Sequence, residues 1–177
     1  MSLKKFEFSK SPDDSPKKLT SIDRLKVAIA VHQQGRLDEA EKTYQSILKI
    51  HPSNPDALHF FGVLLHQRGR TKEAVARIER ALKINPAYLD ARMNLGNIYK
   101  ETGDMPKAAA IFRKVITSHP QHANAYNNLG VVLRKSDQLE ESAQALEHAL
   151  TLDPNNADFL QNLGNTYKSQ FEIGKAI

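Results

Sequence analysis

A 34-residue period organises most of this 177-residue chain. A proline recurs at this spacing along the sequence, as Pro52, Pro86, Pro120 and Pro154. Two glycine series share the period: Gly62, Gly96, Gly130 and Gly164, and Gly35, Gly69 and Gly103. Several independent series with one spacing make coincidence negligible, so the chain is predicted to be an array of similar structural units.

Counted from Ser21, the units span residues 21–54, 55–88, 89–122 and 123–156, with a partial fifth unit at 157–177 and a polar tail at 1–20. Each full unit is predicted to form two helices. In the third unit, helical periodicity over 89–102 ends at Gly103, and a second helix over 106–118 ends before Pro120. One such hairpin cannot bury its own apolar face. The hairpins must therefore stack, which predicts an all-α, right-handed α-solenoid with a concave face.

The third and fourth units show the pattern most clearly, in the stretches DARMNLGNIYKETGDMPKAAAIFRKVITSHP and NAYNNLGVVLRKSDQLEESAQALEHALTLDP. This pattern resembles the tetratricopeptide repeat (TPR), and the resemblance covers residues 21–177. It implies a scaffold for protein-protein interaction. The sequence departs from the pattern at Val27 and Ala28, where later units have a larger residue and glycine, at Asp137, which replaces the turn glycine, and at Ser142, which replaces alanine. We expect a less tightly packed first unit and a weak turn at Asp137.

The resemblance also implies that the first helix of each pair lines the concave wall. The inward positions share one helical face. The peptide-binding candidates on this face are Asn94, Asn97, Lys100, Asn127, Asn128, Arg134, Asn162, Asn165 and Lys168. Three of them, Asn94, Asn128 and Asn162, form an asparagine ladder beside a basic row of Lys100, Arg134 and Lys168.

Asparagine is a poor helix former, so its repetition on a helix face needs an explanation. An amide side chain offers one acceptor and two donor hydrogens, which allows it to pair with the N–H and C=O of any passing peptide. We expect weak, sequence-tolerant binding of an extended peptide, with the basic row favouring an acidic one. The alternative is that these asparagines are consensus residues of the repeat, solvated and without a ligand.

The N-terminal part of the predicted concave face is apolar. Its inward positions include Leu25, Ile29, Phe60 and Val63. Exposed apolar patches commonly mark contact sites. The tail at 1–20 contains Leu3, Phe6 and Phe8, and we expect it, or the tail of a neighbouring copy, to lie in this groove. The alternative is a tail that does not dock there.

The sequence offers no chemistry for catalysis. There is no cysteine, no phosphate-binding glycine loop, no dinucleotide fingerprint and no nucleophile elbow. His119 and His122 flank a turn between units but have no third converging ligand, so no metal site is expected. The chain is therefore predicted to be neither an enzyme nor a binder of a cofactor.

The formal charge of +5 raises the question of a nucleic acid partner. The positive excess lies in residues 1–122, whereas 123–156 is acidic, and no single-sign surface extends along the chain. Nucleic acid binding would also require stacking aromatic residues, but Tyr99, Phe112 and Tyr167 are assigned to packing. A protein or peptide partner is expected instead. Strong salt dependence of binding to a polyanion would favour the nucleic acid alternative.

The apolar stretches are too short to span a bilayer, and no export signal is visible, so a cytoplasmic protein without membrane contact is expected. The fifth unit stops at Ile177, where its second helix should begin. This predicts a longer protein, or self-association through this end or the N-terminal tail. The first two units are similar to arrays that precede catalytic domains in bacterial proteins, including those that resemble O-linked N-acetylglucosamine transferases and sulfotransferases. That similarity implies an alternative role, as the substrate-recruiting arm of a larger transferase whose catalytic domain is absent from this chain.

Overall fold

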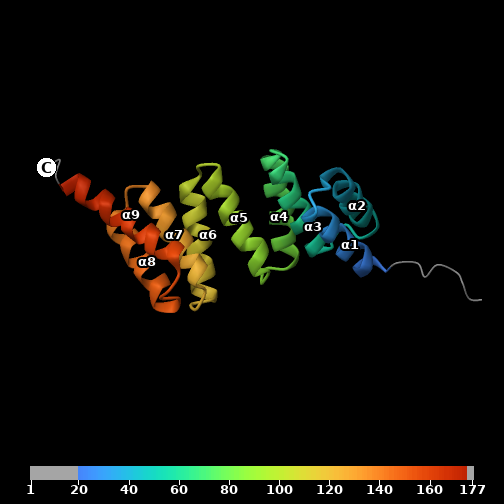
Figure 1. Cartoon of the computed structure of the whole chain (residues 1–177). Coiled ribbons are helices and arrows are strands. Elements are labelled where there is room, and N and C mark those ends of the chain that lie inside the picture. The colour runs from blue at the N-terminus through green and yellow to red at the C-terminus, as the bar shows by residue number, and fades with distance from the viewer. Residues whose placement is uncertain (1–19, 175–177) are drawn as a thin grey trace, which may run out of the picture.

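The computed structural model describes residues 20–174, and the tail residues Leu3, Phe6 and Phe8 lie outside that range. Within it the chain forms nine helices and no strand. They are α1 (Ser21–Gln33), α2 (Leu37–Ile50), α3 (Pro55–Gln67), α4 (Thr71–Ile84), α5 (Leu89–Glu101), α6 (Met105–Ser118), α7 (Ala123–Lys135), α8 (Leu139–Leu152) and α9 (Ala157–Gly174). Figure 1 shows them following one another along an elongated molecule, from α1 at one end to α9 at the other. The predicted all-α solenoid of helical hairpins is confirmed.

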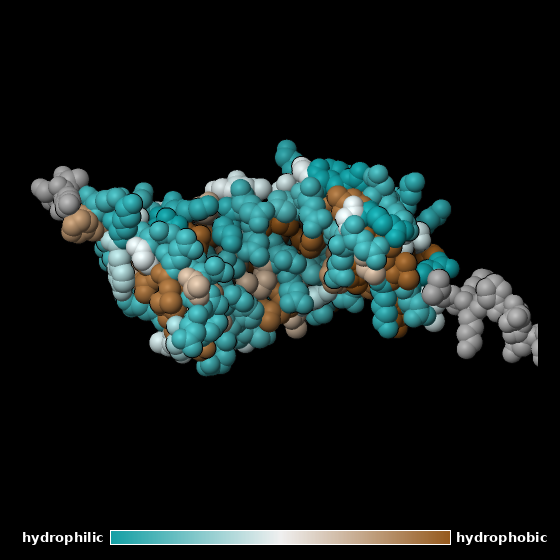
Figure 2. Space-filling view, viewed as in Figure 1, coloured by the Kyte–Doolittle hydropathy of each residue, from teal (hydrophilic) through white to brown (hydrophobic). Residues whose placement is uncertain are grey.

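Helix contacts are confined to neighbouring units. Each odd-numbered helix from α1 to α7 packs against the even-numbered helix that follows it, and each even-numbered helix packs against the next odd-numbered one. Odd-numbered helices also contact the next odd-numbered helix, as α5 contacts α7. In the described part of the chain no helix reaches further than this. The surface is mostly hydrophilic, with apolar patches toward both ends of the molecule (Figure 2).

In the second, third and fourth units, the paired helices approach one another closely at the glycine in the middle of the odd-numbered helix. A Cβ atom added at Gly96 would lie 2.7 Å from Phe112 Cε1, and one added at Gly130 would lie 2.5 Å from Leu146 Cγ. Carbon atoms prefer about 3.5–4.0 Å, so any side chain at these positions would force the helices apart. Gly96 therefore marks a close approach of α5 and α6. At Gly164 no atom lies within 4 Å of such a Cβ, because no described helix covers that side of α9.

The turn inside each hairpin requires a left-handed backbone. Gly35, Gly69 and Gly103 take φ values of +76°, +76° and +84°. Asp137 occupies the equivalent place in the fourth unit with φ of 58°, a conformation that aspartate tolerates better than most residues. In the fifth unit the place is taken by Phe171, and α9 continues as one 18-residue helix instead of turning.

Two departures from the repeat pattern, at Val27 with Ala28 and at Ser142, have clear structural outcomes, and one packing assignment needs correction. Val27 is 47% exposed while Ala28 is buried, so the first unit leaves more of its apolar surface uncovered. Ser142 is fully buried, and its hydroxyl donates to the Gly130 carbonyl oxygen at 2.8 Å. The assignment of Tyr167 to the core was wrong: its side chain is 46% exposed on α9, because the neighbours of α9 within residues 20–174 are α7 and α8 alone.

Candidate functional site

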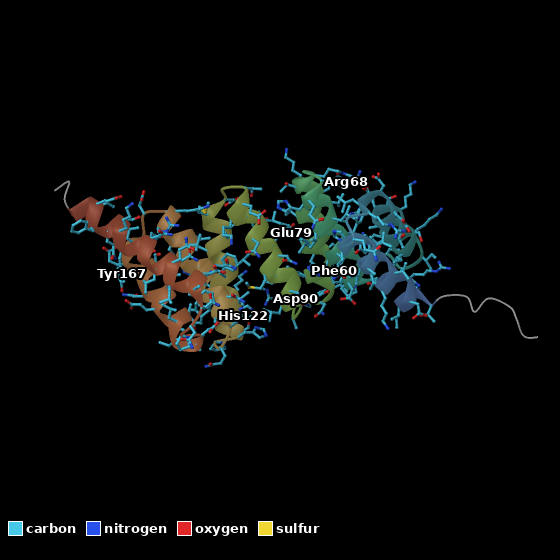
Figure 3. The ribbon with its side chains drawn as sticks, viewed as in Figure 1. Phe60, Arg68, Glu79, Asp90, His122 and Tyr167 are labelled. Atoms are coloured by element: carbon cyan, nitrogen blue, oxygen red, sulfur yellow. The ribbon has the colours of Figure 1, made fainter. Side chains whose placement is uncertain are left out.

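The odd-numbered helices form one wall of the molecule, which we call the inner wall. It carries a groove that begins with an N-terminal hollow of about 470 Å³ between α1 and α3. Ile29, Phe60 and Val63 supply its apolar lining, together with the polar side chains of His32 and Gln67. Figure 3 labels Phe60 on α3. Three of the four predicted apolar residues therefore meet in one hollow. The fourth, Leu25, is half-buried against the core and does not line it.

A central hollow of about 260 Å³ continues the groove between α3 and α5. Its base includes Val63, and its sides include His66, Asn94, Asn97 and Glu101. Both hollows share Val63 and Gln67, so they form one continuous groove across three helices. The groove changes from apolar at α1 to polar at α5.

Hydrogen bonds between residues 35 positions apart cross the inner wall from one unit to the next. His32 Nε2 bonds Gln67 Oε1 at 2.9 Å, and His66 Nε2 bonds Glu101 Oε2 at 2.8 Å. The first bond joins the first unit to the second, and the second bond joins the second unit to the third. Both use the same two positions of the repeat. The sequence interpretation missed this network, although the recurrence of a polar residue 35 positions after each of these histidines was a visible signal.

A second set of bonds across units involves the asparagine ladder. Asn94 Nδ2 donates to His59 Nε2 at 2.7 Å, and Asn162 Nδ2 donates to Asn127 Oδ1 at 2.9 Å. In the unit between them, Met93 stands at the place of His59 and Asn127, and its thioether sulfur is only a weak hydrogen-bond acceptor. The ladder thus joins neighbouring helices, a use that the sequence interpretation did not foresee.

Asn128, the middle residue of the ladder, bonds differently. Its Oδ1 accepts a hydrogen bond from Lys100 Nζ at 2.8 Å. Each of the three ladder amides therefore keeps part of its hydrogen-bonding capacity for a ligand. Asn97 contrasts with them, because its Oδ1 is buried and has no hydrogen-bond partner within the described residues.

The remaining predicted residues lie toward α9. The Asn165 side chain is exposed, and Lys168 Nζ lies 3.9 Å from a carboxylate oxygen of Glu172. Arg134 is half-buried, and its Nε has no hydrogen-bond partner among residues 20–174. The structure thus places these three residues on α7 and α9 but does not bring them into either hollow of the groove.

Positive charge gathers where α5 and α7 end. We define the cationic cluster as Lys100, Arg134 and Lys135. Burial lowers the pKa of Lys100, and Lys135 lowers it further, whereas Glu101 raises it. Within the described range, none of the three cations has a carboxylate oxygen within 4.0 Å. The cluster therefore makes no direct ion pair within the described residues, and Glu101 balances its charge only in part.

His59 is the most enclosed titratable group of the inner wall. Its ring is buried, Nδ1 bonds the Tyr88 hydroxyl at 3.0 Å, and Nε2 accepts from Asn94. Burial lowers the pKa of His59, while the carboxylates of Asp90 and Asp56 act in the opposite direction. Figure 3 labels Asp90 at the start of α5. A neutral ring satisfies both bonds, so His59 acts as a structural link.

The histidines at the turn between the third and fourth units have local partners. His122 Nδ1 accepts from the Ala125 N–H at 3.1 Å and so caps α7, and His119 Nδ1 bonds the Ser118 hydroxyl at 2.9 Å. Across residues 20–174, no three metal-ligating side chains converge on one point. No helix in that range has the length and apolar character needed to cross a membrane.

Two family models cover most of the sequence. One, described as tetratricopeptide repeat, matches residues 31–84 and 65–130, and another, described as TPR repeat, matches residues 132–170. The chain belongs to the tetratricopeptide repeat family. A comparison with curated protein sequences finds no match. The resemblance to arrays that precede transferase domains therefore stays a prediction.

Several solved tetratricopeptide structures have the same fold. MamA residues 41–end from Desulfovibrio magneticus RS-1 is 22% identical, with a TM-score of 0.79 over 88% of each chain. PilF of Pseudomonas aeruginosa is 19% identical, with a TM-score of 0.77 over 86% of this chain and 69% of PilF. YrrB, described as a TPR protein with an unusual peptide-binding site, is 21% identical, with a TM-score of 0.72 over 87% of this chain and 79% of YrrB. At these identities the likeness shows the fold alone.

Proposed function

We propose that this chain is a protein-interaction scaffold that binds an extended segment of a partner protein along its inner wall. The observation that carries this proposal is the continuous groove formed by the two hollows across α1, α3 and α5. Apolar hollows with a few polar groups are the usual form of a ligand site. YrrB, which has the same fold, is described as having a peptide-binding site, and this is consistent with the proposed role.

The free polar atoms of the inner wall suit a peptide backbone. Asn94 and Asn128 each keep donors or acceptors beyond the bonds that they make, and Asn97 lines the central hollow beside Asn94. Each hydrogen bond to a ligand contributes about 0.5–1.5 kcal/mol net. A few such bonds give weak and sequence-tolerant binding, so we propose that the apolar hollow supplies the rest of the affinity.

Three further expectations belong to this proposal. The role is proposed to be non-enzymatic, as expected for a scaffold that acts by binding its partner. The candidates nearer α9, Arg134, Asn165 and Lys168, are proposed to contact the part of a ligand that leaves the groove. Cytoplasmic location and self-association through α9 or the tail stay predictions.

Site-specific photocrosslinking tests where ligands bind. A photoreactive amino acid is placed at Asn97 on the inner wall or, as the matched control, at Lys114, which is exposed on α6. Peptides selected for binding from a random library are then crosslinked and mapped. We expect crosslinks at position 97 and none at position 114. Crosslinks confined to position 114, or the failure of selection to yield any binding peptide, would contradict the proposed function.

A further inference from the structure

We infer that the bound segment carries a large apolar side chain and a carboxylate side chain about six residues apart. The apolar side chain binds in the N-terminal hollow, and the carboxylate binds at the cationic cluster of Lys100, Arg134 and Lys135. This inference rests on the proposed function, and it names the chemistry that the inner wall selects. It derives from two parts of the wall, the N-terminal hollow and the cationic cluster, because the surroundings of each favour a different kind of ligand side chain.

The N-terminal hollow favours an apolar side chain because its lining is largely apolar and the His32 ring within it is already paired. His32 bonds both the Tyr44 hydroxyl, at 3.3 Å, and Gln67, at 2.9 Å. The surface that remains for a ligand comes largely from Ile29, Phe60 and Val63. An apolar side chain that enters this hollow leaves water without depriving His32 of its partners, which favours its burial there.

The cationic cluster favours an anion because its positive charge is only weakly balanced. Lys100 is half-buried, and its one hydrogen-bond acceptor is the neutral oxygen of Asn128. Glu101 is the acidic group whose charge acts on Lys100, but its carboxylate bonds His66 and makes no direct ion pair with Lys100. Arg134 holds a buried Nε without a partner in the described chain. A ligand carboxylate would neutralise charge that the described residues compensate only in part.

Helix dipoles offer a simpler explanation for the position of these cations. Cations near a helix C-terminus interact favourably with the helix dipole, and both Lys100 and Arg134 lie in a last turn. That interaction is available to a fully solvated side chain. It does not account for the burial of Lys100 or for the unpaired Nε of Arg134, both of which cost free energy without a ligand.

The spacing follows from the geometry of the array. The N-terminal hollow lies between α1 and α3, and the cationic cluster lies on α5 and α7, which is two units further along. Neighbouring helices pack about 10 Å apart, so the two sites are roughly 20 Å apart. An extended chain rises about 3.3 Å per residue, which corresponds to about six residues. The residue midway between them faces the polar central hollow.

Synthetic peptides test this inference against the whole chain. The probe is a fluorescently labelled, end-capped ten-residue peptide of serine, threonine and glycine, with leucine at position 2 and glutamate at position 8. Its controls carry glutamine or lysine at position 8, serine at position 2, or the glutamate moved to position 5. The set is also made in reversed order, since the spacing does not fix the direction of the chain. Fluorescence anisotropy gives the dissociation constants.

The comparison uses whichever of the forward and reversed sets binds more tightly. In that set, we expect the lysine control to bind about ten-fold more weakly than the probe, and the other controls to bind several-fold more weakly than the probe. The double variant Lys100→Gln, Arg134→Gln should lose the preference for glutamate over glutamine but keep the preference for leucine. The matched variant Lys83→Gln, Lys114→Gln removes two exposed charges on α4 and α6 and should keep both preferences. Circular dichroism checks that each variant retains its helices.

The outcomes separate this inference from the proposed function. If all peptides crosslink at position 97 with the same affinity, the inference is wrong while the groove remains the binding site. If the probe binds but crosslinks at position 114 alone, both are wrong. Absence of binding by every peptide up to 1 mM, or loss of the glutamate preference in the matched control variant, also overturns the inference.

Discussion

The same substitution, glycine to alanine, should have different effects at two equivalent helix positions. Gly130 lies in α7 against Leu146, whereas Gly164 lies in α9 with no atom within 4 Å of an added Cβ. Alanine is more favourable than glycine inside a helix by about 0.8–1 kcal/mol. That gain is common to both positions, so the difference between the two variants isolates the effect of packing.

The packing effect is worked out from the contact at Gly130. An added Cβ would lie 2.5 Å from Leu146 Cγ and 3.0 Å from Leu146 Cδ2, and Leu146 is fully buried. About 1 Å of separation between α7 and α8 is needed to relieve this overlap. Overpacking of this kind costs about 1–3 kcal/mol. Gly164→Ala should therefore stabilise α9 by about 1 kcal/mol, and Gly130→Ala should leave α7 and α8 about 1–3 kcal/mol less stable relative to that variant.

Amide hydrogen exchange is the appropriate assay, because a repeat array can open unit by unit. We expect faster exchange in α7 and α8 of Gly130→Ala, and slower exchange in α9 of Gly164→Ala. Adding Leu146→Ala should cost less in the Gly130→Ala background than in the unmodified chain, since it removes the overlap. Equal changes in protection for the two glycine variants would refute this reasoning about close helix approach.

Two further predictions concern single residues. Asp137→Gly should stabilise the fourth hairpin by about 0.5–1 kcal/mol, because Asp137 holds φ of 58°, and an unchanged or lowered urea midpoint would contradict this. Because burial lowers the pKa of His59, the folded chain should lose stability as the pH falls below about 6.5, where the unfolded ring gains a proton more readily than the buried one. Urea midpoints at pH 7.5 and 5.5 should therefore differ more in the unmodified chain than in His59→Gln, and an equal difference would rule out His59 as a source of the pH dependence.

The fold was predictable because the determining residues act locally. Gly103 and Pro120 mark a turn and a helix end through their own backbone limits, and Gly96 marks a close approach through its missing side chain. Repetition of these signals fixed the hairpins without knowledge of any distant contact. The site was less predictable, because it depends on how one unit is offset from the next.

That offset explains the errors at the inner wall. The sequence indicated that Asn94 and Asn162 face inward, but their bonds to His59 and Asn127 depend on the lateral distance between neighbouring odd-numbered helices. Likewise, the exposure of Tyr167 could not be read from its position in the repeat, since the same position is covered in a unit whose second helix is present. The length of α9, in contrast, depends on its local sequence. Phe171 in place of a turn glycine was a visible signal that this helix continues.

The restriction of helix contacts to adjacent units has a mechanical consequence. No helix contact links distant parts of the described array. Its curvature is therefore the sum of small rotations between successive hairpins. A ligand that spans three units would fix two of these rotations at once. We expect such a ligand to stiffen the array and to change the separation of α1 and α9, while every hairpin keeps its own internal packing.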